Sequence, residues 1–76
     1  MPAPPAHTRI ADHYRARILS GELQPGDKLP KQLEIAAEWH CSVQPVKAAL
    51  LRLELEGLVE NRQGVGASVA HRDEGA

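Results

Sequence analysis

The stretch from Cys41 to Val69, CSVQPVKAALLRLELEGLVENRQGVGASV, decides the fold predicted for this chain. Ser42 is a favourable N-cap, because its hydroxyl can accept a hydrogen bond from an amide of the first helical turn. Pro45 falls within that turn, where its missing N–H deprives no intrahelical carbonyl of a partner. We therefore expect a helix that begins just after Ser42.

An apolar stripe runs along this helix. Val46, Ala49, Leu50 and Leu53 recur at steps of three and four residues, which places them on one helical face. Gly57 follows the last of these positions and can adopt the left-handed conformation that ends a helix. The stripe predicts a buried face, with the helix stopping at Gly57.

Two short strands are expected after Gly57. The apolar pair Leu58-Val59 opens the first, Gly64-Val65-Gly66 reverses the chain, and Ser68 and Val69 belong to the return strand. A helix followed directly by a hairpin is typical of a winged helix-turn-helix. The alternative, a plain three-helix bundle, has no need of the hairpin.

The segment before Cys41 predicts two further helices. Thr8 is expected to cap the first of them, and Arg9, Arg15 and Arg17 lie off its buried face together with Asp12. The expected buried face consists of Ile10, Ala11, Tyr14 and Ile18. The second helix is expected to open at Pro30. Its inner side should hold Gln32, Ile35, Ala36 and Trp39, the last with its indole N–H at the surface.

A turn and a brief extended segment connect these two helices. Leu23 is expected to pack beneath the first helix, ahead of a turn at residues 24–27. Lys28-Leu29 should pair with the later hairpin. The predicted fold class is therefore mainly α, with three helices and a wing sheet of two to three strands. We expect residues 1–7 to form a disordered proline-rich arm, residues 8–71 the domain, and residues 72–76 a disordered tail.

Bulk composition limits the possible functions. The chain has 76 residues, enough for one domain, and a single cysteine, which allows no intramolecular disulfide and fits a cytoplasmic setting. Cys41 is expected to be a buried, inert thiol. The balance of 9 Lys and Arg against 10 Asp and Glu gives a net charge of −1, which argues mildly against nucleic-acid binding. No stretch has the length of a membrane span.

Chemically active clusters are not evident in the sequence. The four histidines, His7, His13, His40 and His71, lack metal-ligand spacing with a cysteine or carboxylate. No acid, base and nucleophile are placed as a catalytic set. We predict no metal, no cofactor and no enzymatic activity.

Residues 10–70 resemble the DNA-binding domain of the GntR family of bacterial transcription regulators. The matching pieces are Leu19 to Gly21, Pro25-Gly26-Asp27, Leu29-Pro30, Ser42, Pro45-Val46, Ala49-Leu50, Arg52-Leu53-Glu54, Glu56-Gly57-Leu58-Val59, and Gln63-Gly64 with Gly66. The resemblance implies a third helix in the major groove and a wing on the flanking backbone or minor groove. In that family an effector-binding or dimerising domain follows, and we expect this chain to lack one.

The chain departs from the family pattern at charged positions. The family commonly has arginine where this chain has Leu33, Val43, Leu51 and Val65, and Lys47 replaces a further arginine. Lysine keeps the charge but loses the planar fork that pairs with guanine or phosphate. Helical angles place a largely apolar set on the outer face of the third helix, bordered by Leu33. This set is Val43, Gln44, Lys47, Ala48, Leu51 and Leu55.

Two functions therefore compete. The first is a DNA-binding transcriptional regulator of GntR type, a dimer on double-stranded operator DNA. Its predicted DNA contacts are Lys31, Gln32, Ser42, Val43, Gln44, Pro45, Lys47, Arg52, Arg62, Gln63, Gly64 and Gly66. The alternative is a degenerate winged helix that binds another protein through an exposed apolar face. The residues of that face are Leu33, Val43, Ala48, Leu51 and Leu55.

Overall fold

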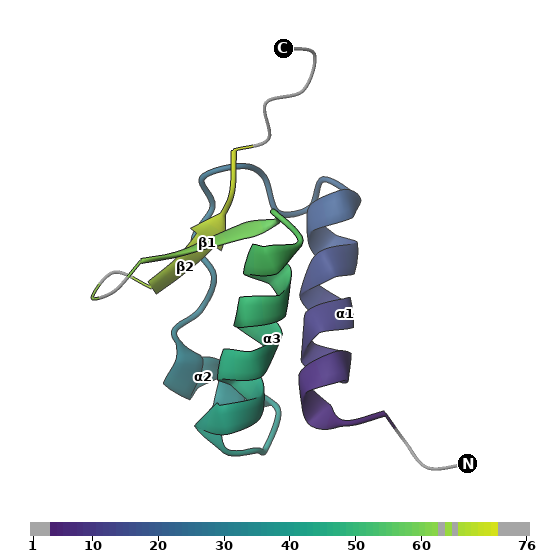
Figure 1. Ribbon diagram of the computed structural model, residues 1–76, viewed down its shortest axis with the longest axis vertical. Coiled ribbons are helices and arrows are strands. Elements are labelled where there is room, and N and C mark those ends of the chain that lie inside the picture. The colour runs from purple at the N-terminus through teal and green to yellow at the C-terminus, as the bar shows by residue number, and fades with distance from the viewer. Residues whose placement is uncertain (1–3, 63, 65, 72–76) are drawn as a thin grey trace.

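A computed structural model of the chain describes residues 4–62, 64 and 66–71. Three helices precede a two-stranded antiparallel hairpin (Figure 1). The elements are α1 (Ala6–Leu19), α2 (Gln32–Glu38), α3 (Val43–Leu55), β1 (Val59–Arg62) and β2 (Gly66–Val69). This order confirms the predicted fold class, a winged helix-turn-helix. None of the described helices has the length and apolar character needed to cross a membrane.

Helix α1 packs along α3 and begins earlier than predicted. The carbonyl of Pro5 accepts hydrogen bonds from the amides of Thr8 (3.0 Å) and Arg9 (3.1 Å), so Pro5 occupies the N-cap. The expected cap at Thr8 is therefore wrong, and Ala6 and His7, assigned to the arm, are helical. The predicted inner face is confirmed, because Ile10, Ala11, Tyr14 and Ile18 are all buried.

Helix α3 forms the centre of the core. Its predicted stripe, Val46, Ala49, Leu50 and Leu53, is between 0% and 2% exposed. At the C-terminus, Gly57 has φ of +81° and donates its amide to the carbonyl of Glu54 (2.9 Å), while Leu58 donates to Leu53 (2.9 Å). This pair of bonds is a Schellman motif, which requires a left-handed residue at the position of Gly57. The predicted stop is confirmed.

The hairpin forms the wing, and a third segment pairs with it. The strand register joins Val59 to Val69 and Arg62 to Gly66. Lys28 forms an isolated antiparallel bridge with Ser68, and the amide of Leu29 donates to Ala67 (3.0 Å). The predicted pairing of the Lys28-Leu29 segment with the hairpin is confirmed.

Helix α2 and its turn differ from the prediction in detail. The helix begins at Gln32 rather than Pro30, because Lys31 is the N-cap and its amide donates to the Glu34 carboxylate (3.3 Å). The turn into α3 passes through His40, which has a φ of +53° in the left-handed region. Cys41 follows it and packs against the core, but it is half-buried rather than buried as expected.

Trp39 closes the core between α1 and α2, and one prediction about it is wrong. Its indole N–H is buried and has no hydrogen-bond partner in the described part of the chain, whereas we expected it at the surface. The reason is packing from α1. The ring of His13 lies edge-on at 5.4 Å between centroids, and the guanidinium carbon of Arg9 lies 5.5 Å from the indole centroid.

Candidate nucleic-acid interface

The outer face of α3 is open to solvent, as predicted. Gln44, Lys47 and Ala48 are exposed, and Leu51 and Leu55 are 54% and 79% exposed. Val43 differs from them, because it is half-buried and packs against the core. Val43 therefore offers a smaller surface to a partner than its helical angle indicated.

The N-terminus of α3 presents backbone amides that have no acceptor within the helix. Ser42 occupies the N-cap in an extended conformation, but its side chain makes no capping hydrogen bond, so this part of the prediction is wrong. The first amides of a helix lack intrahelical acceptors, and the helix dipole makes this end positive. Pro45, in the first turn, has no amide to satisfy. Such an end is suited to a phosphate oxygen.

A groove of about 650 Å³ lies between the start of α2 and the wing. It brings together residues that are distant in sequence, including five of the predicted DNA contacts. The lining residues are Pro30, Lys31, Gln32, Leu33, Leu50, Asn61, Arg62, Gly64, Gly66 and Ala67. Gln63, a predicted DNA contact, and Val65, where the family commonly has arginine, lie outside the described residues.

Asn61 in this groove was not among the predicted site residues. Its Nδ2 donates a hydrogen bond to the carbonyl of Leu50 (3.2 Å), which ties β1 to α3 and fixes the wing beside the helix. The alternation of side chains along β1 was a signal for this role. Glu60 and Arg62 are exposed on one face of the strand, so Asn61 between them points to the opposite face.

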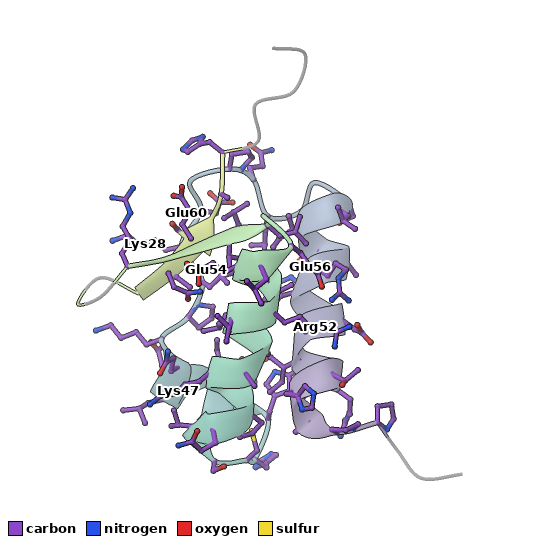
Figure 2. All side chains as sticks on the ribbon, in the orientation of Figure 1. Lys28, Lys47, Arg52, Glu54, Glu56 and Glu60 are labelled. Carbon is purple, nitrogen blue, oxygen red and sulfur yellow. The ribbon has the colours of Figure 1, made fainter. Side chains whose placement is uncertain are left out.

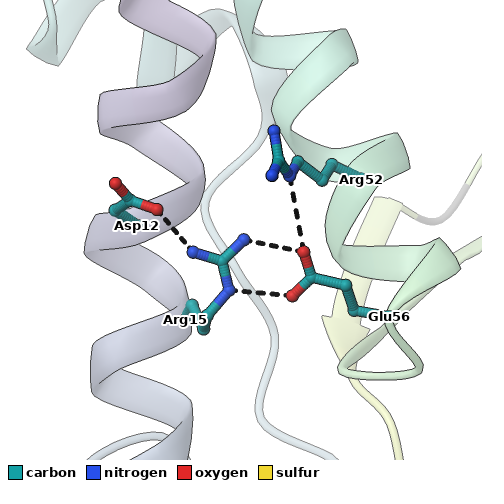
Figure 3. A network of polar contacts seen from close by, with 4 residues as sticks. All are labelled: Asp12, Arg15, Arg52 and Glu56. Atoms are coloured by element: carbon teal, nitrogen blue, oxygen red, sulfur yellow. Dashed lines mark hydrogen bonds and ion pairs between the residues drawn. The ribbon is translucent and has the colours of Figure 1, made fainter. Parts of the chain in front are cut away.

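Arg52 does not lie with the other predicted contacts. Lys47 and Arg52 project from opposite sides of α3, and Arg52 lies toward α1 (Figure 2). Its Nε is 3.5 Å from the Glu56 carboxylate. Glu56 also accepts two hydrogen bonds from the guanidinium of Arg15 (2.8 and 2.7 Å), which contacts Asp12 as well (Figure 3).

These ion pairs join α1 to the end of α3. The hydrogen bond from Arg15 lowers the pKa of the Glu56 carboxyl, and the same contact raises the pKa of Arg15. The spacing of Arg52 and Glu56 by four residues is a recognisable helical ion-pair signal. Nothing in the sequence indicated that Arg15 pairs with Glu56, because the two residues are 41 positions apart.

Positive charge on the side of the groove and outer face is modest. Lys31, Lys47 and Arg62 are exposed there, but Arg62 lies 3.8 Å from the carboxylate of Glu60. Glu54 projects from the Lys47 side of α3 (Figure 2). The basic residues are therefore only partly concentrated on this side, and the objection to DNA binding from the net charge of −1 is only partly answered. Among the described residues, no group of three or more His, Cys, Asp or Glu side chains could hold a metal ion.

The family follows from a match that covers most of the chain. Residues 6–69 match the family model described as bacterial regulatory proteins, gntR family. The chain belongs to the gntR family. The resemblance drawn from the sequence is thus confirmed. The gntR family consists of regulatory proteins, which agrees with the prediction of no enzymatic activity.

Relatives of this gntR-family chain include longer proteins. It is 34% identical over 70 residues to the uncharacterized HTH-type transcriptional regulator YhcF of Bacillus subtilis, covering 92% of this chain and 58% of YhcF. It is 38% identical over 65 residues to the mannosyl-D-glycerate transport/metabolism system repressor MngR of Escherichia coli, covering 86% of this chain and 27% of MngR. The chain thus spans little more than half of YhcF and about a quarter of MngR.

A solved relative contains DNA. The crystal structure of AraR(DBD) in complex with operator ORX1 superposes with a TM-score of 0.85 and 25% identity, covering 90% of this chain and 82% of that one. The hypothesis of a protein-binding module gains no comparable support, although its leucines are exposed as predicted. The comparisons favour the DNA-binding hypothesis for this gntR-family domain.

Proposed function

We propose that this chain is a DNA-binding transcriptional regulator that acts by occupying operator DNA in the cytoplasm. The observation that carries the proposal is the TM-score of 0.85 with a domain crystallised on an operator. The described geometry supports it, because the described residues expected to meet DNA, with the exception of Arg52, gather at two adjoining places. One is the N-terminal half of α3, and the other is the groove between α2 and the wing.

Helix α3 would enter the major groove by its first turns. In helix-turn-helix proteins the N-terminal residues of this helix contact base edges. Gln44, Lys47 and Ala48 are exposed there, and the amides at the start of α3 add donors beside the hydroxyl of Ser42. Gln44 can both donate and accept hydrogen bonds, and Lys47 supplies a charge for a phosphate or a base.

The groove would hold the flanking phosphate backbone. Lys31 and Gln32 line it from the α2 side, and Arg62 lines it from the wing side. Gly64 and Gly66 have φ of +81° and +107°, and a Cβ placed on either would meet no atom within 4 Å. The backbone at these two glycines is therefore open, so a phosphate can approach its amides closely. Gln63, between Arg62 and Gly64 in sequence, belongs to the same proposed contact.

The proposed assembly is a homodimer. Each phosphate contact contributes about 0.9 to the salt slope of log K, and non-specific binding typically has Kd of roughly 10⁻⁴–10⁻⁶ M at physiological salt. Few exposed cations, among them Lys31, Lys47 and Arg62, lie on this side in the described part of the chain, so a monomer would bind weakly. Two copies on a repeated half-site double the number of contacts, which is how dimeric helix-turn-helix proteins bind.

Fluorescence anisotropy with a labelled mixed-sequence duplex tests the proposal. We expect the wild-type chain to bind at low salt and to weaken steadily as salt rises. Leu51→Arg adds a charge on the outer face of α3 and should bind more tightly. Leu19→Arg adds the same charge to an exposed position at the end of α1 and serves as the matched control. Absence of wild-type binding even at low salt would contradict the proposal.

A further inference from the structure

Gln44 and Ala48 form a short row on the side of α3 opposite its buried stripe. They are four residues apart, so they lie one turn from each other on the same helical face. Both are exposed, and both fall in the N-terminal half of the helix. Gln44 carries an amide and Ala48 carries a methyl group, and these two groups favour contact with particular bases.

The N-terminal half of helix α3 lacks arginine, the side chain that most often specifies guanine. The sequence of the helix, VQPVKAALLRLEL, contains a single arginine, Arg52. That guanidinium lies 3.5 Å from Glu56, on the opposite side of α3 from Lys47 (Figures 2 and 3). A contact of arginine or lysine with guanine O6 and N7 is the commonest specific contact in the major groove. The first turns of α3 hold no arginine, and their lysine, Lys47, lacks the planar fork of arginine and is proposed to contact a phosphate.

The side chains present suit A·T pairs instead. A glutamine amide matches adenine, because its oxygen can accept from the N6 amino group while its nitrogen donates to N7. A small apolar side chain can contact the thymine methyl group, which only thymine presents in the major groove. Gln44 and Ala48 therefore supply the two contacts that distinguish A·T pairs.

We infer that Gln44 and Ala48 direct this domain to operator half-sites with A·T pairs at the bases facing the start of α3. The inference rests on the proposed DNA binding and adds the class of sequence that is recognised. One helical turn rises about 5.4 Å, and successive bases of one strand are about 3.4 Å apart. The two side chains thus meet bases one or two steps apart, which places the adenine and the thymine either next to each other or one base pair apart in the half-site.

The rest of the apolar outer face plays a lesser part in this recognition. Leu55 lies eleven residues beyond Gln44, about 16 Å along the helix at about 1.5 Å per residue. Bases are contacted from the N-terminal part of a recognition helix. Leu55, although 79% exposed, is therefore not expected to affect base preference.

Selection from a duplex library with randomised base pairs, followed by anisotropy on the enriched site, tests the inference. Wild type should enrich half-sites that contain two A·T pairs, either adjacent or one base pair apart. Replacing the contacted adenine by 7-deazaadenine removes N7 and should weaken wild-type binding by roughly fivefold or more. Gln44→Ala should bind both duplexes equally. Gln24→Ala, at an exposed glutamine in the turn before Lys28, should behave as wild type.

A base substitution in the DNA tests the contact proposed for Ala48 with the wild-type protein. Deoxyuridine in place of the contacted thymine removes only the methyl group, and about two- to fourfold weaker binding is expected from the transfer free energy of one buried methyl. If wild type binds DNA with a clear salt slope but enriches G·C pairs or nothing, the inference is overturned and the proposed function stands. If Gln44→Ala keeps the adenine preference, the inference is overturned in the same way. If wild type binds no duplex at low salt, the proposed function itself fails.

Discussion

Leu53 and Leu55 stand two residues apart on α3, yet they belong to different environments. Leu53 is 0% exposed and packs in the core, whereas Leu55 is 79% exposed on the outer face. The same side chain therefore contributes to folding at one position and is available for contact at the other. The helix period alone separates the two roles.

The basic residues of α3 show the same division. Lys47 is exposed on one side, while Arg52 faces α1 and joins the ion pairs of Glu56 and Arg15 (Figures 2 and 3). A positive charge on a recognition helix is thus not sufficient evidence of a DNA contact. What the charge already pairs with decides whether it remains available to a phosphate.

The largest expected effect separates the two leucines. Leu53→Ala should lower the free energy of unfolding by about 2–5 kcal/mol, because it leaves a cavity in a close-packed core. Leu55→Ala should change it by less than about 0.5 kcal/mol, as is usual for exposed positions. Urea denaturation of both variants gives the comparison. Similar losses at the two positions would contradict the assignment of the two faces.

A smaller effect is expected at the turn between α2 and α3. His40 has a φ of +53°, a conformation that costs non-glycine residues about 1–2 kcal/mol. His40→Gly should remove this strain and, after the greater chain entropy of unfolded glycine, raise the free energy of unfolding by about 0.5–1 kcal/mol. Ala37→Gly, within α2, is the matched control and should lower stability by about 1 kcal/mol.

Thermal unfolding measures the stability of both variants, His40→Gly in the turn and Ala37→Gly in α2. Because neither residue lies on the outer face of α3, His40→Gly should leave DNA affinity unchanged, which separates stability from contact once more. A loss of stability in His40→Gly would show that the imidazole contributes more than the backbone strain costs.

The smallest predicted effect concerns the ion pairs between α1 and α3. The hydrogen bond from Arg15 holds the pKa of Glu56 below its ordinary 4.5 in the folded chain. The associated stability is therefore present above pH 4.5 and is lost as pH falls through the lower folded value. Glu56 is about one third exposed, so solvent screening limits this stability to under about 1 kcal/mol.

Urea denaturation at a series of pH values reveals this contribution. Wild type should be more stable than Glu56→Gln near pH 7, and the difference should shrink steadily below pH 4.5. Glu54→Gln, at an exposed carboxylate on the same helix, is expected to show no such convergence. A difference that grows toward acidic pH would contradict the sign of the shift.

Much of the fold was predictable because it depends on local spacing. The buried stripe of α3 and the stop at Gly57 follow from periodicity and backbone conformation, and both are confirmed. The contacts that proved different depend on tertiary packing. Arg15 reaches Glu56 from 41 residues away, and α1 covers the indole N–H of Trp39. A helical pattern predicts neither the contact of Arg15 with Glu56 nor the burial of the Trp39 indole N–H.

The candidate site was predictable to a similar extent. Exposure of Gln44, Lys47 and Ala48 followed from helical angles. The groove that joins α2 to the wing did not, since it depends on how the hairpin folds back beside α3 and on the bond from Asn61 to Leu50. Which of these residues contact DNA remains a prediction of the proposed function.

The salt dependence of DNA binding by Lys47→Ala and Arg52→Ala tests the division between the two sides of α3 most directly. Both variants remove one positive charge from the same helix, so the net charge change is identical. Anisotropy titrations across a salt series should show a slope reduced by about 0.9 per bound copy for Lys47→Ala, which loses one phosphate contact in each copy. Arg52→Ala should retain the wild-type slope. An equal reduction in both variants, or a reduction in Arg52→Ala alone, would contradict the account.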